Sequence, residues 1–146
     1  MRKNPTVARA RSIRIESRTE RLIAVRDFVS EEARSFGFDD EEISKIALAV
    51  DEACTNIIKH AYRFDPTKWL TVKVQPHDKE FEVVISDHGF HFDPGSIRLP
   101  DMKEYLTHYR HGGLGVYLMK SLMDKVEYRN QPGKKNEVRL VKYLSH

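Results

Sequence analysis

One long amphipathic segment constrains this chain more than any other part of its sequence. Its apolar residues recur at the three- and four-residue spacing of an α-helix over about five turns. They are Ile43, Ile46, Ala47, Val50, Cys54, Ile57, Ile58 and Ala61. The acidic run Asp39–Glu42 suits an N-cap and a first helical turn, and Pro66 prevents the helix from continuing. The sequence therefore predicts a long helix with one side turned toward a core.

Shorter elements are predicted on both sides of this helix. We expect a half-buried strand at 8–16, a helix at 18–36 that stops at Gly37, strands at 69–75 and 81–86 joined by a turn at 76–78, a helix at 113–123, and strands at 126–129 and 137–143. A long irregular stretch, 87–112, includes a short helix near 102–106. Strands outnumber crossovers, which favours an α+β fold with a mixed sheet and helices on one face.

Composition excludes several classes of protein. With 146 residues, 40% hydrophobic and 32% charged, the chain has the length and make-up of one globular domain spanning 1–146. Cys54 has no partner for an intrachain disulfide. The longest stretch without a charged residue, 111–119, is far shorter than the roughly 20 residues of a membrane span, and the N-terminus lacks a secretory apolar run. We expect a cytoplasmic protein with no membrane partner, and a net charge of +3 does not indicate a nucleic-acid partner.

The polar side of the long helix carries the first candidate site. On a helical wheel with Val50 at zero, Glu52 lies at roughly 200° and Asn56 at roughly 240°, opposite the apolar stripe. One interpretation is a solvated helix surface. The other is a carboxylate and a carboxamide, one turn apart, that face a ligand. Such a carboxylate accepts a proton, and a carboxamide oxygen suits Mg²⁺.

Two further motifs have a chemical and a plain interpretation. Asp87 and Gly89 follow an apolar strand, where the carboxylate would accept a hydrogen bond from an amino group and the glycine would let a ligand approach; an ordinary turn is the alternative. The second motif opens a helix with exposed backbone N–H groups that favour phosphate, or else forms a flexible hinge. Its residues are Gly112, Gly113, Leu114, Gly115 and Val116.

Taken in order, these motifs resemble the ATP-binding domain shared by gyrase, Hsp90, histidine kinases and MutL. Within that superfamily the chain is most similar to the bacterial anti-sigma-factor serine/threonine kinases, over about residues 9–143. The run from Glu52 to Tyr62 resembles the N-box, a helix that ends in His-Ala-Tyr. Asp87–Gly89 resembles the adenine-binding box, and 112–119 resembles the second glycine box. The resemblance implies a two-layer α/β sandwich of the Bergerat (GHKL/HATPase) type, with a mixed, mostly antiparallel sheet.

The resemblance also implies a role for each motif residue, with ATP and Mg²⁺ as cofactors. Glu52 would be the general base and Asn56 the Mg²⁺ ligand. Asp87 would accept the adenine amino group, with Gly89 permitting its approach. Gly112, Gly113, Leu114, Gly115 and Val116 would hold the phosphates, and 93–111 would form a short lid. Where many relatives carry a threonine that assists adenine recognition, this sequence has Asn136 or Glu137.

The function implied by the resemblance is that of an ATP-dependent serine/threonine kinase and anti-sigma regulator. Such a protein binds a sigma factor and phosphorylates an anti-anti-sigma (STAS-type) partner. An alternative is a nucleotide-gated binding module without significant kinase activity. A detached histidine-kinase domain fits less well, because only about 17 residues precede the first expected helix. The resemblance further implies a homodimer, for which the strand at 8–16 is a candidate edge.

Overall fold

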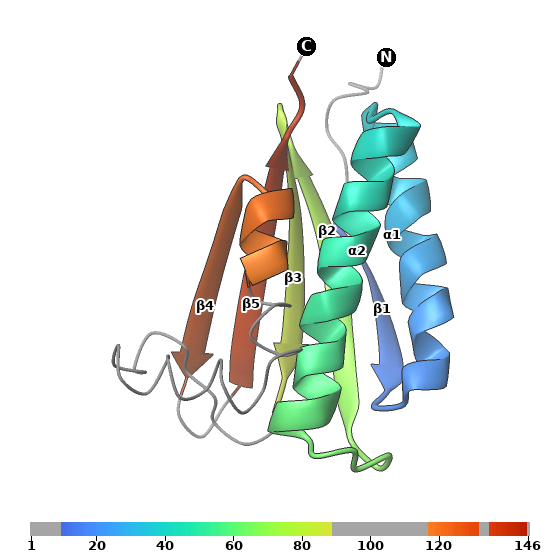
Figure 1. Ribbon diagram of the computed structural model, residues 1–146, viewed down its shortest axis with the longest axis vertical. Coiled ribbons are helices and arrows are strands. Elements are labelled where there is room, and N and C mark those ends of the chain that lie inside the picture. Colours follow the sequence, from blue (N-terminus) through green and yellow to red (C-terminus); the bar gives the residue numbers. More distant parts are fainter. Residues whose placement is uncertain (1–9, 89–116, 132–134, 146) are drawn as a thin grey trace, which may run out of the picture.

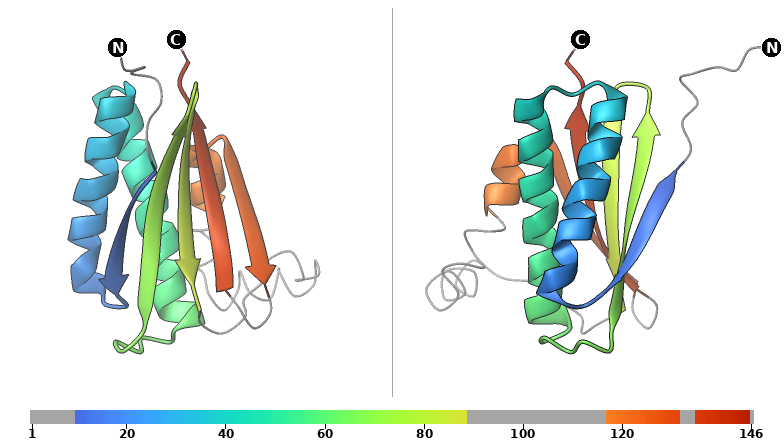
Figure 2. Two further views of the ribbon diagram at one scale, coloured as in Figure 1. Left: turned by 180° about the vertical axis from the view of Figure 1, so that it is seen from behind. Right: turned by 90° about the vertical axis from the view of Figure 1, so that its right-hand side faces the viewer.

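The protein forms a five-stranded sheet with helices on one face (Figures 1 and 2). The computed structural model describes residues 10–88, 117–131 and 135–145. The strands are β1 (Arg11–Glu16), β2 (Trp69–His77), β3 (Glu80–Asp87), β4 (Lys125–Gln131) and β5 (Lys135–Tyr143), in the spatial order β1-β2-β3-β5-β4. The expected α+β two-layer class is confirmed.

The sheet is antiparallel at every described pairing, which agrees with the expected mostly antiparallel sheet. The connection between β1 and β2 contains two antiparallel helices. The chain reverses three times, before α1, between the helices and before β2, so β2 returns antiparallel to β1 (Figure 1). β3 and β4 run in the same direction, but β5 lies between them and is antiparallel to both. No parallel neighbours therefore arise among these strands.

The first two long helices begin and end close to their predicted limits. They are α1 (Leu22–Phe36), which follows a 3₁₀ turn η1 (Thr19–Arg21), and α2 (Asp40–Asn56). Gly37 has a φ of 119°, so it provides the left-handed conformation that ends α1. The Asp39 carboxylate accepts a hydrogen bond of 2.9 Å from the backbone N–H of Glu42 and caps α2. The predicted stop and cap are confirmed.

The end of the long helix differs from the prediction of five regular turns. α2 ends at Asn56 and passes directly into a π-helical turn, η2 (Ile57–Ala61), whose last bond runs from the Tyr62 N–H to the Ile57 carbonyl at 2.9 Å. Arg63 and Phe64 then adopt left-handed φ values of 50° and 63°. Apolar periodicity did not reveal the change, because Ile57, Ile58 and Ala61 are buried here as well.

The hairpin between β2 and β3 closes later than the sequence predicts. The strands pair as far as His77 and Glu80, so the loop is Asp78–Lys79 rather than 76–78. Pro76 lies inside β2, where it pairs with Phe81 on one side. Among the described residues, the pairing of β1 with β2 ends at Val74. Pro76 lies beyond this point, so the backbone N–H that it lacks is not needed for a hydrogen bond to β1.

The core lies between the helices and one face of the sheet (Figure 2). Alternate residues of β2 and β3 point inward, which follows from the two-residue period of a strand. Phe36, Phe38 and Phe81 form an aromatic cluster at the α1–α2 connection, with ring centroids 5.4–5.6 Å apart. Cys54 is fully buried, as expected for a packed thiol.

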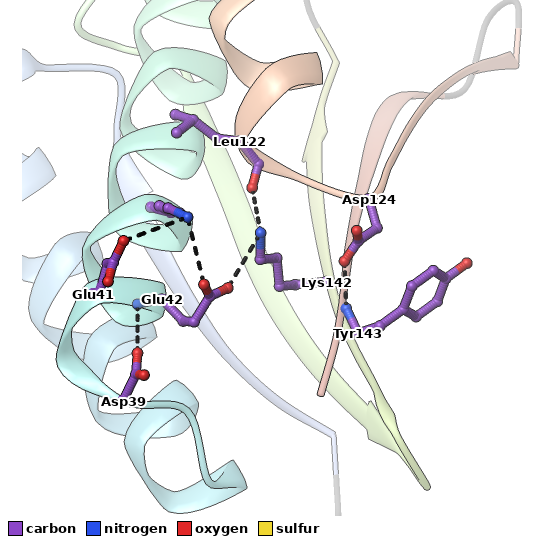
Figure 3. A network of polar contacts seen from close by, with 8 residues as sticks. Asp39, Glu41, Glu42, Leu122, Asp124, Lys142 and Tyr143 are labelled. Atoms are coloured by element: carbon purple, nitrogen blue, oxygen red, sulfur yellow. Dashed lines mark hydrogen bonds and ion pairs between the residues drawn. The ribbon is translucent and has the colours of Figure 1, made fainter. Parts of the chain in front are cut away.

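A lysine joins the third helical segment, residues 117–122, to the rest of the fold (Figure 3). Lys142 Nζ donates a hydrogen bond of 2.7 Å to the Leu122 carbonyl and lies 3.3 Å from Glu42 Oε1. Next to it, the Asp124 carboxylate accepts a 2.7 Å hydrogen bond from the Tyr143 N–H. These contacts hold the end of the helical segment against α2 and β5.

Candidate functional site

A cavity lies at the end of the sheet where β3 ends and β5 begins, beside the last residue of α2. The space between its walls is about 470 Å³, which includes a part open to solvent. Its walls are mainly apolar with a few polar groups. They are formed by Ala53, Asn56, Ile57, Ala61, Asp87, Met119, Tyr128, Asn136, Glu137 and Val138.

Asp87 is the buried carboxylate of this cavity. It is the last residue of β3, and 4% of its surface is exposed. Asn136 lies opposite it on β5 and donates a hydrogen bond of 3.2 Å from Nδ2 to Asp87 Oδ1. A charged group is costly to bury without polar partners, and this hydrogen bond offsets part of that cost at the cavity wall. The carboxylate is suited to accept a hydrogen bond from a ligand N–H.

Asn56 reaches the same cavity from the opposite layer. It is half-buried at the C-terminal end of α2. The wheel predicted a position away from the apolar stripe, and in the fold that side of the helix end faces the cavity. The structure therefore brings Asn56 and Asp87 together from distant parts of the sequence. Among the described residues, no three His, Cys, Asp or Glu side chains form a metal-binding group.

Glu52 lies one turn before Asn56 and is not among the residues that line the cavity. It is half-buried, and this burial raises the pKa of its carboxyl group above the ordinary 4.5. The charge of Asp51 raises the pKa further, while Lys59 lowers it. Asp51 itself pairs with Arg26 of α1, whose Nε lies 3.2 Å from Asp51 Oδ1. A carboxylate with a raised pKa is a better proton acceptor than an ordinary surface glutamate.

The remaining predicted site residues lie outside the described part of the chain. They are Gly89, Gly112, Gly113, Leu114, Gly115 and Val116, together with the lid at 93–111 and the short helix near 102–106. Their roles stay predictions.

Tyr62 is a residue to which the sequence analysis assigned no role. It is 4% exposed, and its hydroxyl donates a 2.5 Å hydrogen bond to the Trp69 carbonyl and accepts a 2.8 Å bond from the His88 N–H. Burial raises the pKa of the Tyr62 hydroxyl, and the nearby charge of Asp87 adds to this effect. In the sequence, the position of Tyr62 at the end of the His-Ala-Tyr run could have indicated a role in the site.

The sheet register resolves an ambiguity in the sequence. Either Asn136 or Glu137 stood at the position of the expected threonine, and Asn136 is the residue that pairs with Asp87. Met119, Tyr128 and Val138 also line the cavity. Met119 lies in the run that resembles the second glycine box, whereas no role was predicted for Tyr128 or Val138.

The sequence was compared with models of known protein families. A family profile described as "Histidine kinase-like ATPase domain" matches residues 15–142. The chain belongs to the histidine kinase-like ATPase family. The resemblance inferred from the motifs is thereby confirmed.

Within this family the chain is similar to serine-protein kinases named RsbW. It is 31% identical to RsbW of Bacillus subtilis (strain 168) over 138 residues, which cover 91% of this chain and 84% of that protein. It is 28% identical to RsbW of Bacillus cereus (strain ATCC 10987 / NRS 248) over 136 residues, covering 90% and 83% of the two chains. These relatives place the chain in the RsbW-like serine-protein kinase branch of the family.

A solved structure supports the fold. The crystal structure of the RsbU and RsbW domains of Rv1364c from Mycobacterium tuberculosis matches with a TM-score of 0.67 at 17% identity. The match covers 95% of this chain and 33% of that one. No helix in the described ranges is both long enough and apolar enough to cross a membrane.

Proposed function

We propose that this protein is an ATP-dependent serine/threonine kinase. It transfers the γ-phosphoryl group of ATP to a hydroxyl of an anti-anti-sigma (STAS-type) protein, and it binds a sigma factor as its second partner. The observation that carries the proposal is the cavity in which Asp87 and Asn56 meet in a member of the histidine kinase-like ATPase family. Such a regulator acts in the cytoplasm.

The described residues fit an adenine nucleotide with Mg²⁺. Ile57, Met119 and Val138 would supply apolar walls for a flat purine ring, and the Asp87 carboxylate would accept a hydrogen bond from its amino group. Asn56 offers a carboxamide oxygen, which suits Mg²⁺ together with the phosphate oxygens. In phosphoryl transfer, Mg²⁺ neutralises part of the charge on the phosphates.

Glu52 is the proposed general base. As the serine or threonine hydroxyl attacks the γ-phosphorus, its proton passes to the Glu52 carboxylate, the new O–P bond forms and ADP leaves. The raised pKa of Glu52 brings this carboxyl group closer to the pH at which a base works well. Glu52 lies one helical turn from Asn56, so the proton acceptor and the proposed Mg²⁺ ligand share one rigid element.

One observation favours the alternative of a nucleotide-gated binding module without significant kinase activity. Glu52 does not line the cavity that contains Asp87. A binding module needs the nucleotide contacts but no proton acceptor. The two functions therefore differ in their dependence on Glu52.

Transfer of labelled γ-phosphate separates the two functions. Each purified STAS-type protein of the source organism is incubated with Mg²⁺–ATP and the wild-type protein, E52Q or E41Q. We expect E52Q to reduce transfer about 10²–10⁴-fold with little change in Mg²⁺–ATP affinity. E41Q, which removes a carboxylate from the exposed first turn of α2, is the matched control. Equal transfer by E52Q and wild type would reject the base, and no transfer by wild type would favour the binding module.

A direct binding measurement tests the cavity assignment. Replacing the acceptor carboxylate by the D87N change removes a charged partner for the adenine amino group, so we expect Mg²⁺–ATP affinity to fall about 10–100-fold in calorimetry. Thermal melting checks that the variant is folded. Unchanged affinity would remove Asp87 from the site.

We also propose that the protein is a homodimer. β1 lies at an edge of the sheet, with β2 as its described partner, so its outer side is available to a second copy. Light scattering after size exclusion measures the molar mass directly. A monomer at micromolar concentration would contradict this part of the proposal.

A further inference from the structure

We propose that Tyr62 is a positioning residue for nucleobase recognition, because its hydroxyl holds the backbone next to Asp87. This inference rests on the proposed function, in which Asp87 accepts the amino group of adenine. It adds to that function a residue of the helical layer, Tyr62, which would help the protein to select adenine over other bases.

The two hydrogen bonds of the Tyr62 hydroxyl have opposite polarity. It accepts from the N–H of His88, the residue directly after Asp87, at 2.8 Å. It donates to the carbonyl of Trp69, the first residue of β2, at 2.5 Å. The neighbouring residue Leu70 is the sheet partner of Asp87. A single hydroxyl therefore connects the ends of β2 and β3 beside the carboxylate, and the donor and acceptor roles fix its orientation.

The π-helical turn explains how Tyr62 reaches the sheet. On an unbroken α-helix Tyr62 would lie roughly 100° from the centre of the apolar stripe, outside the buried side. The wider turn at Ile57–Ala61 changes the direction of the residues that follow, and Tyr62 is buried. The chain then passes through left-handed conformations at Arg63 and Phe64, which are unfavourable for residues with a side chain.

The turn also couples Asn56 and Asp87, two of the polar residues that line the cavity. It begins at the residue after Asn56, and its C-terminal neighbour Tyr62 bonds to the residue after Asp87. The Tyr62 contact thereby fixes the end of the helical element that carries Asn56 relative to the strand that carries Asp87. Removing the hydroxyl takes away one hydrogen-bond partner from both the His88 N–H and the Trp69 carbonyl, which favours a shift of the backbone at Asp87.

The experiment compares two nucleotides in the presence of Mg²⁺. The probes are ATP and purine riboside triphosphate, which lacks the 6-amino group and cannot donate to Asp87. The Y62F change removes the hydroxyl and keeps the ring. We expect the wild-type protein to prefer ATP, and Y62F to lose about 3- to 10-fold in ATP affinity but less than about 2-fold for the analogue.

The matched control is Y143F, which makes the same chemical change on β5 at a partly exposed tyrosine that does not line the cavity. It should keep both affinities. A purely structural role of Tyr62 would weaken both nucleotides equally or neither, and either result would overturn the inference while the Asp87 assignment stands. A wild-type protein without preference for ATP would instead contradict the base recognition of the proposed function, and the inference with it.

Hydrogen exchange of the wild-type protein gives a second test that needs no variant. The His88 N–H is expected to exchange slowly, like the paired amides of β3, because Tyr62 accepts its hydrogen bond. Exchange of the His88 amide as fast as that of exposed turn residues such as Asp78 would overturn the inference, whether or not Y62F folds.

Discussion

Asn136 and Asp87 face each other across β5 and β3, and the carboxamide nitrogen of Asn136 lies 3.2 Å from a carboxylate oxygen of Asp87. The family resemblance implied a threonine near this position, and the sequence has Asn136 there instead. The carboxamide supplies a donor to the carboxylate, as a hydroxyl would. With asparagine in place of threonine, Asp87 still has a hydrogen-bond donor opposite it, and a carboxamide supplies it instead of a hydroxyl.

Replacing Asn136 should weaken nucleotide binding in a graded way. N136A removes one hydrogen-bond donor from a buried carboxylate, and we expect Mg²⁺–ATP affinity to fall about 3- to 10-fold in calorimetry. N136T restores a donor and should recover affinity to within about 2-fold of wild type. Wild-type affinity in N136A, with an unchanged melting temperature, would show that the contact has no part in binding.

Arg26 should control the pH dependence of the proposed kinase through Asp51. Arg26 lies 3.2 Å from Asp51, and the charge of Asp51 raises the pKa of Glu52. R26Q leaves that charge without its ion-pair partner, so the pKa of Glu52 should rise further. Because the base must be ionised, activity falls as pH drops through this pKa, and the acidic limb of kcat/KM should move to higher pH.

The matched control for this prediction is R34Q, since Arg34 pairs with the exposed Asp40 at 3.7 Å at the other end of the two helices. Its pH profile should equal that of wild type. An acidic limb that stays in place in R26Q would contradict the coupling between Asp51 and Glu52.

Glu82 should stabilise the open face of the sheet in a pH-dependent way. Burial would raise the pKa of Glu82, but hydrogen bonds from His77, at 2.9 Å, and from Arg139 outweigh it, so the pKa is lowered from 4.5. A lowered pKa in the folded state gives stability that is present above the unfolded-state pKa and lost as pH falls through the folded-state pKa. We expect E82Q to lose about 1–2 kcal/mol in urea unfolding at pH 7.

The difference between E82Q and wild type should shrink as the pH falls below 4.5, because the wild-type carboxylate becomes protonated. E31Q, on the exposed face of α1, is the control and should unfold like wild type at both pH values. A difference of the same size at pH 7 and under acidic conditions would contradict an electrostatic origin.

Lys142 should be needed for stability because its ammonium group contacts both the helical segment 117–122 and α2. Its side chain is 12% exposed and bonds to the Leu122 carbonyl and Glu42 (Figure 3). K142M keeps the aliphatic part and removes both contacts, so we expect a loss of about 1–3 kcal/mol in urea unfolding. K73M, at an exposed position of β2, is the control. Equal stability of K142M and wild type would show that the contact contributes nothing.

Local signals predicted most of the elements correctly. Gly37 and Asp39 mark the connection between α1 and α2 because each acts on the backbone within a few residues of itself. The strands of the β2–β3 hairpin were predicted from composition and alternation. The exact turn was missed, since Pro76 is tolerated in β2 by a pairing pattern that involves a third strand.

The site was only partly predictable from the sequence. Asn56 and Asp87 were selected by residue type and motif order, and the fold brings both to one cavity. The part played by Tyr62 was missed because the wheel assumed a regular helix through Ala61, whereas the helix changes to a π-turn at Ile57. The cavity walls at Met119 and Val138 depend on segments far away in the chain.

By itself, the sequence determined the order of helices and strands, the family and the polar residues of the motifs, because capping, periodicity and residue chemistry act over a few neighbouring residues. The tertiary structure decided the antiparallel sheet, the π-turn after Asn56, the choice of Asn136 as partner of Asp87, and the use of the Tyr62 hydroxyl. The sheet order and the contacts of Asn136 and Tyr62 depend on hydrogen bonds between residues that are distant in the chain, and their geometry exists only when the layers have come together.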